Sequence, residues 1–139
     1  MNRLLAAALG TVLGTLTGCG LDSKVCPAIV VIPQVGVTWQ VGTLPYGEGS
    51  TYRLCVDERC ESGVPRRYGD ELRVGLKLPE GYDERRAQIR VELSGGQDAI
   101  GLKTSRTITL RQVKEGCGQA LSRELRLTSE GELEERSVE

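Results

Sequence analysis

Residues 86–93 read RAQIRVEL, and apolar side chains alternate with charged or polar ones throughout this stretch. Successive side chains of a β-strand point to opposite faces, so a period of two predicts a strand with one buried face and one face in water. Residues 34–42 and 71–78 repeat the alternation. Half-buried strands of this kind are typical of antiparallel sheets.

Weaker strand patterns fill much of the remaining chain. They occupy residues 28–32, 51–56, 100–113 and 120–128, and residues 100–113 form either two strands or one strand with a bulge. Turn-rich segments, among them residues 61–70, separate these strands, and no segment has a sustained helical period. About seven short strands joined by turns predict an all-β fold, a single antiparallel β-sandwich.

The first nineteen residues have the pattern of an export signal. Arg3 precedes an uncharged apolar run, and small residues lead to the sequence LTGC, which ends at Cys19. The run at residues 4–16 is shorter than the roughly 20 residues that cross a membrane. Two other interpretations stay open: an ordinary secretory signal cut near Gly18 or Gly20, and a buried N-terminal helix, which the repeated glycines disfavour.

LTGC resembles the lipobox of bacterial lipoproteins, in which the cysteine thiol takes a diacylglyceryl group and becomes the new N-terminus after cleavage. The resemblance implies that Cys19 anchors the protein at the extracytoplasmic face of the cell membrane, where two or more acyl chains give stable attachment. It divides the chain into a signal peptide (1–18), a lipidated cysteine and tether (19–25), a β-sandwich domain (26–128) and an acidic C-terminal tail (129–139). The tail carries five glutamates, so we expect it to be a frayed strand end or disordered.

The composition excludes several classes of function. The chain has no histidine, so neither a Ser-His-Asp nor a Cys-His catalytic site can be built from its residues. Its 18 basic and 19 acidic residues nearly balance, whereas nucleic-acid-binding proteins usually have a strong basic excess. The sequence has no cofactor motif, and its cysteines form no CxxC pair that would predict a zinc site. We therefore expect no cofactor, no metal and no nucleic-acid partner.

The cysteine count is consistent with a lipid anchor. Of the five cysteines, four remain once Cys19 is assigned to lipid, and four cysteines in an oxidising compartment predict two disulfides. Three pairings are possible. We favour Cys55–Cys60, which would close a hairpin tip, together with Cys26–Cys117, which would join the two ends of the domain. A closed loop of roughly 90 residues is worth about 4–5 kcal/mol in the chain-entropy description.

Two further resemblances involve most of the chain. Cys26, Trp39 and Cys117 are similar to the cysteine, tryptophan, cysteine pattern of immunoglobulin domains, which supports an immunoglobulin-like sandwich. The lipobox, LCVDERC at residues 54–60, TITLR at residues 107–111 and GCG at residues 116–118 together resemble the small uncharacterised lipoproteins of actinobacteria. This second resemblance implies an anchor and no particular activity.

Several residues are candidates for contact with a partner. Tyr46, Tyr68 and Tyr82 lie in predicted loops or at their borders, where a tyrosine either contacts a protein or glycan partner or acts as a staple for the loop. Arg66 and Arg67 precede Tyr68 in a segment bordered by glycine and proline, which makes this segment the best local candidate for contact with an anion or a lipid headgroup. A solvated loop is the alternative. Trp39 alternates with valines and is expected in the core.

These observations predict a lipid-anchored module of the cell envelope that binds or supports another component and has no catalytic activity. Its partners would be the membrane, through the anchor, and an envelope protein or glycan. One alternative is an inhibitor or escort of a secreted enzyme that presents the Cys55–Cys60 loop as a rigid tip. A further alternative is a small envelope hydrolase that uses paired carboxylates.

Overall fold

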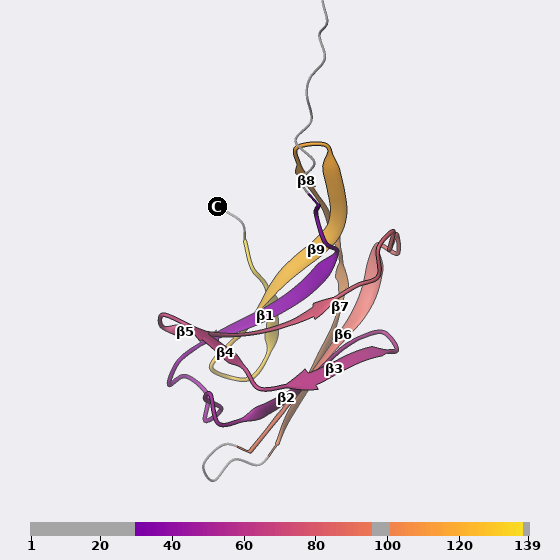
Figure 1. The fold of residues 1–139 in the computed structure, drawn as a ribbon. Coiled ribbons are helices and arrows are strands. Elements are labelled where there is room, and N and C mark those ends of the chain that lie inside the picture. The colour runs from indigo at the N-terminus through magenta and orange to yellow at the C-terminus, as the bar shows by residue number, and fades with distance from the viewer. Residues whose placement is uncertain (1–29, 96–100, 138–139) are drawn as a thin grey trace, which may run out of the picture.

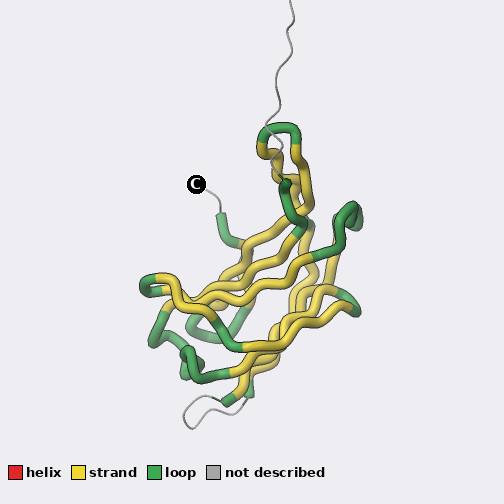
Figure 2. Tube along the Cα trace, in the orientation of Figure 1, coloured by secondary structure: helices red, strands yellow, loops and turns green. Residues whose placement is uncertain are grey.

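The structure, a computed structural model, describes residues 30–95 and 101–137 as an all-β domain (Figure 1), which confirms that the fold is all-β. The predicted signal peptide, Cys19 and the tether lie outside the described residues. Within those residues there are ten strands and no helix (Figure 2), and so no helix long and apolar enough to cross a membrane. The strands are β1 (Gln34–Gln40), β2 (Thr51–Val56), β3 (Arg59–Gly63), β4 (Arg66–Tyr68), β5 (Glu71–Lys77), β6 (Arg86–Ser94), β7 (Leu102–Thr109), β8 (Arg111–Glu115), β9 (Gly118–Leu127) and β10 (Leu133–Glu135).

The strands form two sheets around one core. The larger sheet has the order β10-β9-β1-β5-β4, with β8 also paired to β9, and the smaller has the order β3-β2-β6-β7. Alternate side chains of both sheets meet in a single apolar cluster, because the period of two directs one set from each strand inward. Its largest member is Trp39, which is 1% exposed and donates a hydrogen bond from Nε1 to the Tyr46 carbonyl at 3.0 Å.

One strand pair of the larger sheet is parallel, contrary to the predicted antiparallel arrangement. β1 pairs antiparallel with β5 on one edge and parallel with β9 on the other. Alternation shows which face of a strand is buried and says nothing about the direction of its neighbours, so the sequence pattern could not reveal this pair. The strand order also differs from the immunoglobulin order, in which the first two strands pair in one sheet, since β1 and β2 lie in different sheets here.

The segment at residues 100–113 contains two strands, one of the two predicted forms. β7 pairs with β6 in the smaller sheet, whereas β8 pairs with β9 in the larger one. Leu110 lies between them, 1% exposed, and its N–H donates to the Arg85 carbonyl at 2.6 Å. A buried residue thus marks the point at which the chain passes from one sheet to the other, and the β8–β9 hairpin projects beyond the rest of the domain (Figure 1).

Two predicted segment boundaries are wrong. Residues 30–32, part of the strand expected at residues 28–32, are not in a strand; Val30 is 82% exposed, so its apolar side chain has no core to join. Conversely, the tail expected to be frayed or disordered contains β10, which pairs with the end of β9. Leu133 lies in the core and is 4% exposed. Glu135 forms an ion pair with the buried Arg123, with an N···O distance of 2.9 Å. The acidic composition of this segment predicts an exposed tail, although the segment contains one leucine that packs in the core.

The disulfide Cys55–Cys60 is confirmed. The two cysteines face each other across the β2–β3 hairpin, with their Cα atoms 4.0 Å apart. Cys117 is not a free thiol, but its predicted partner Cys26 lies outside the described residues. The Cys26–Cys117 pairing therefore stays a prediction.

Candidate functional site

Tyr46 is not a contact residue. It is 4% exposed and belongs to the core cluster, where its carbonyl accepts the Trp39 hydrogen bond. Of the two roles proposed for the loop tyrosines, Tyr46 therefore has that of a staple. The residues beside it, 45 and 47–49, are exposed, so Tyr46 is the side chain of this segment that reaches the core.

Arg66, Arg67 and Tyr68 form the short edge strand β4 and not a loop. Because neighbouring side chains of a strand point to opposite faces, Arg66 and Tyr68 share the outer face of the larger sheet while Arg67 points the other way. Arg66 lies directly opposite Arg73 of β5, and Arg67 donates from Nε to the Gly69 carbonyl at 2.9 Å. The predicted arginine pair is thereby divided between two surfaces.

Tyr82 lies apart from the β4 residues. It is half-buried in a hollow at the β2–β3 tip that also includes Asp57 and Glu84. Burial raises the pKa of the Tyr82 hydroxyl above its usual value, and the Asp57 carboxylate adds to this effect. The predicted contact residues are therefore distributed over the core, the β4 edge and the β2–β3 tip.

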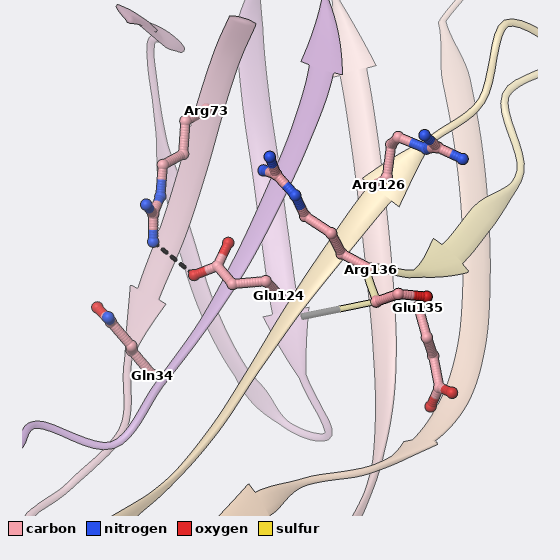
Figure 3. A pocket seen from close by; sticks show the side chains of 7 residues that line it. Gln34, Arg73, Glu124, Arg126, Glu135 and Arg136 are labelled. Carbon is pink, nitrogen blue, oxygen red and sulfur yellow. Dashed lines mark hydrogen bonds and ion pairs between the residues drawn. The ribbon is translucent and has the colours of Figure 1, made fainter. Parts of the chain in front are cut away.

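An ion-pair network covers the outer face of the larger sheet. Glu124 of β9 accepts from Arg73 of β5 at 2.5 Å (Figure 3), and Arg136 contacts Glu71 at 3.3 Å. Between β9 and β5 lies Gly36 of β1, whose missing side chain leaves room for the Glu124 carboxylate. Burial raises the pKa of Glu124 above its ordinary value, and this effect outweighs the opposing effect of Arg73.

A hollow of about 830 Å³ lies on this network. Its charged side chains already have ion-pair partners: Arg73 pairs with Glu124 within the hollow, whereas Arg126 pairs with Glu134 at 3.0 Å and Glu135 with Arg123, both outside its lining. Such an arrangement offers an incoming ligand few unsatisfied charges. The lining residues are Gln34, Arg73, Glu124, Arg126, Glu135, Arg136 and Ser137.

A second hollow, of about 530 Å³, lies where β4 ends and the edge of β5 continues; we call it the β5-edge groove. Val64 and Tyr68 in its wall are 56% and 57% exposed, and Tyr52 and Glu61 enter it from the smaller sheet. Burial, and secondarily Glu61, raise the pKa of the Tyr52 hydroxyl. The groove is lined by Gln34, Tyr52, Glu61, Val64, Arg66, Tyr68, Arg73, Val74, Gly75, Leu76 and Lys77.

Gly75 and Lys77, which form one side of this groove, are not among the predicted contact residues. A usable signal was present: Gly75 falls on the polar face of the strand at residues 71–78, between Arg73 and Lys77, where a glycine weakens a strand. In residues 30–95 and 101–137, no three Cys, Asp or Glu side chains converge as metal ligands would.

No protein-family model, curated protein or solved structure matches this chain.

Proposed function

We propose that the protein is a lipid-anchored binding module of the cell envelope. The LTGC sequence ending at Cys19 supports the anchor, and a surface groove supports the binding role. The observation that carries the binding role is the β5-edge groove, in which Arg66 and Tyr68 meet the unpaired edge of β5 and the exposed Lys77. Tyrosine and arginine are among the residue types enriched in binding interfaces.

The proposal assigns no catalytic role to the acids. Glu124 and Glu135, which line the larger hollow, are each held by an arginine, Arg73 and Arg123 respectively. A carboxylate fixed in an ion pair supports the sheet, whereas a glycosidase needs two acids free to exchange protons across a bound sugar. This arrangement supports a structural role for both side chains.

Localisation and photo-crosslinking in the native envelope test the proposal together. The unaltered chain is expected in the membrane fraction, and Cys19→Ser is expected to release a folded domain. A photoreactive phenylalanine analogue at Tyr68 is expected to give a discrete adduct. The same analogue at Val113, which is 42% exposed on β8 and remote from the groove, serves as the matched control and is expected to give none. Equal labelling at both positions, or turnover of envelope polymers by the purified chain, would contradict the proposal.

An inhibitor or escort of a secreted enzyme is the second candidate, favoured by the construction of the β2–β3 tip. Asp57 adopts a left-handed conformation (φ 51°), its Oδ1 accepts from the Gln88 N–H at 2.9 Å, and its carbonyl accepts from Arg90 at 3.0 Å. Together with the Cys55–Cys60 disulfide these bonds fix the tip, as a protruding inhibitory loop requires. A crosslink from position Glu58 to one secreted hydrolase, with none from position Tyr68, would favour this candidate.

A further inference from the structure

We propose that the free edge of β5 accepts an extended acidic segment of a partner protein as an added strand. The inference rests on the proposed binding function and specifies its ligand. It identifies Gly75 and Lys77 as the residues that pair with the incoming backbone and Arg66 and Lys77 as those that contact its carboxylates.

The backbone of β5 has unpaired groups in this groove. Leu78 donates to the Pro33 carbonyl and Val41 to the Asp70 carbonyl, both at 2.8 Å, so the even-numbered residues of β5 bond to β1. In an antiparallel ladder the bonding direction alternates, which turns the peptide groups of residues 71, 73, 75 and 77 away from β1. β4 covers only residues 71 to 73, and no other described strand pairs with this edge.

The chain itself keeps this edge open. Continuing the β4–β5 register backwards would bring Val64 opposite Gly75, but the chain leaves that line at Pro65 to form β3 in the smaller sheet. Val64 thus becomes the far wall of the groove. The N–H and C=O groups of Gly75 and Lys77 face the space between, with the two-residue spacing of an extended peptide, roughly 7 Å.

Gly75 is not required by the fold. A Cβ built there would meet nothing nearer than the Val35 carbonyl oxygen at 3.7 Å, an ordinary contact, and the residue is exposed. Gly36, its partner on β1, differs because Glu124 occupies the space above it. An alanine would fit at this position, so the proposed pairing depends on the backbone N–H and C=O of Gly75 and not on its lack of a side chain.

The side chains around the groove favour acidic residues in the added strand. Arg66 faces Arg73 directly across the strand pair, and like charges in that position repel. Arg73 is neutralised by Glu124, whereas neither Arg66 nor Lys77 forms an ion pair with any described carboxylate. Carboxylates opposite Gly75 and Lys77 would lie on this outer face. The residues between them would point inward, toward Tyr52 and Val64, and should be apolar.

A strand of alternating acidic and apolar residues fits these groups better than an anionic glycan does. A sugar chain can satisfy Arg66 and Lys77, but it does not present alternating N–H and C=O groups at the strand repeat. Glu61, the acid among the lining residues, comes from β3 in the smaller sheet and forms no ion pair with Arg66.

Titration of the chain carrying Cys19→Ser with the capped peptide acetyl-Glu-Val-Glu-Val-Glu-Val-amide, followed by amide NMR, tests the proposal. We expect shifts centred on Gly75 and Lys77. We expect affinity to fall by about tenfold or more when lysine replaces the glutamates, and again when alternate peptide nitrogens are methylated. Equal binding of the methylated peptide, or shifts remote from β5, would overturn the strand pairing. Polygalacturonate is the glycan probe; if it shifts the same amides and the peptide does not, the proposal fails while a binding module stands.

Two substitutions at one position sharpen the test. Gly75→Pro removes an N–H that faces the free edge and not β1, so we expect the domain to fold and peptide binding to be lost. Gly75→Ala keeps the N–H, fits the space, and is expected to retain binding. If Gly75→Pro does not fold, Lys77→Glu and the methylated peptide decide the question. Peptide binding unchanged in Lys77→Glu would contradict the proposed charge pairing.

Discussion

The carboxylate of Glu124 lies over the Cα of Gly36, with Oε2 2.5 Å and Oε1 2.6 Å from the position that a Cβ would take. The two residues are neighbours on the parallel strands β9 and β1. Because Gly36 has no side chain, Glu124 reaches across β1 to Arg73, and the ion pair joins β9 to β5 over the strand between them. A glycine is needed at position 36 because the Glu124 carboxylate occupies the space of a side chain, and not because of the backbone conformation.

Substitution of Gly36 by alanine tests this relationship. The added methyl group must displace the Glu124 carboxylate from Arg73, and we expect Gly36→Ala to lower the free energy of unfolding by about 1 kcal/mol. In a Glu124→Ala background the same substitution should be neutral or stabilising, because alanine is the better strand residue. Urea denaturation of the four proteins gives the coupling energy, expected at about 0.5–3 kcal/mol. If the effects of the two substitutions on the free energy of unfolding are additive, Gly36 and Glu124 are not in contact.

The raised pKa of Glu124 predicts how stability depends on pH. The folded state binds the Glu124 proton more tightly than the unfolded state does, so this residue's contribution is fully present below the unfolded pKa of about 4.5 and is lost as pH rises through the folded pKa. The difference in unfolding free energy between the wild type and Glu124→Gln should therefore fall as pH rises above 4.5 and then level off. Denaturation at a series of pH values measures it. A difference that grows with pH would mean that the effect of Arg73 on the pKa of Glu124 outweighs the effect of burial.

Removing the hairpin disulfide should destabilise the domain moderately. Cys55 and Cys60 are separated by five positions, and a closed loop this short is worth about 2 kcal/mol in the chain-entropy description. We expect Cys55→Ser/Cys60→Ser to lower the free energy of unfolding by about that amount and to leave the β2–β6 pairing intact. Denaturation and amide hydrogen exchange of β2 provide the two measurements. Loss of exchange protection throughout β2 would show that the bridge does more than restrict the unfolded chain.

Leu133 should matter far more than its acidic surroundings indicate. It is 4% exposed, and its carbonyl accepts a hydrogen bond from Arg106 of β7 at 2.8 Å, so β10 joins the two sheets. Truncation of a buried leucine costs about 2–5 kcal/mol, and we expect Leu133→Ala to fall in this range. Glu130→Ala, in the turn that precedes β10, is the matched control and should change stability by less than about 0.5 kcal/mol. Equal effects of the two substitutions on the free energy of unfolding would show that Leu133 does not contribute to the core.

The strands that alternation predicted best are those whose inward sets enter the core. Residues 34–42, 71–78 and 86–93 correspond to β1, β5 and β6, and Trp39 lies in the core as expected. Most of β3 and all of β4 lie in the segment 61–70, which the sequence predicts to be turn-rich, because these strands bury little side-chain area and are held mainly by backbone pairing. Such edge strands leave almost no trace in a hydrophobic pattern.

The candidate site was predictable only in part, for a related reason. Arg66 and Tyr68 stood out by residue type and share one face of β4. The groove beside them exists because β4 ends while β5 continues, so Gly75 and Lys77 gain their role from tertiary structure. Tyr46 is the opposite case, because its residue type suits contact with a partner but its side chain is buried in the core. The groups that define the β5 edge are peptide N–H and C=O groups, which every sequence contains and which only the sheet order leaves unpaired.

The pairing of β1 with β9 has a consequence for the order in which the domain can assemble. Thr38 and the Leu125 carbonyl, joined across this pair, are separated by 87 positions in the chain. As the chain is synthesised from its N-terminus, β1 can meet β5 early, but its other edge stays uncovered until β9 has emerged. Pairing over so long a separation slows folding and exposes an unpaired strand in the meantime. The larger sheet therefore cannot be completed before β9 and β10 have been synthesised.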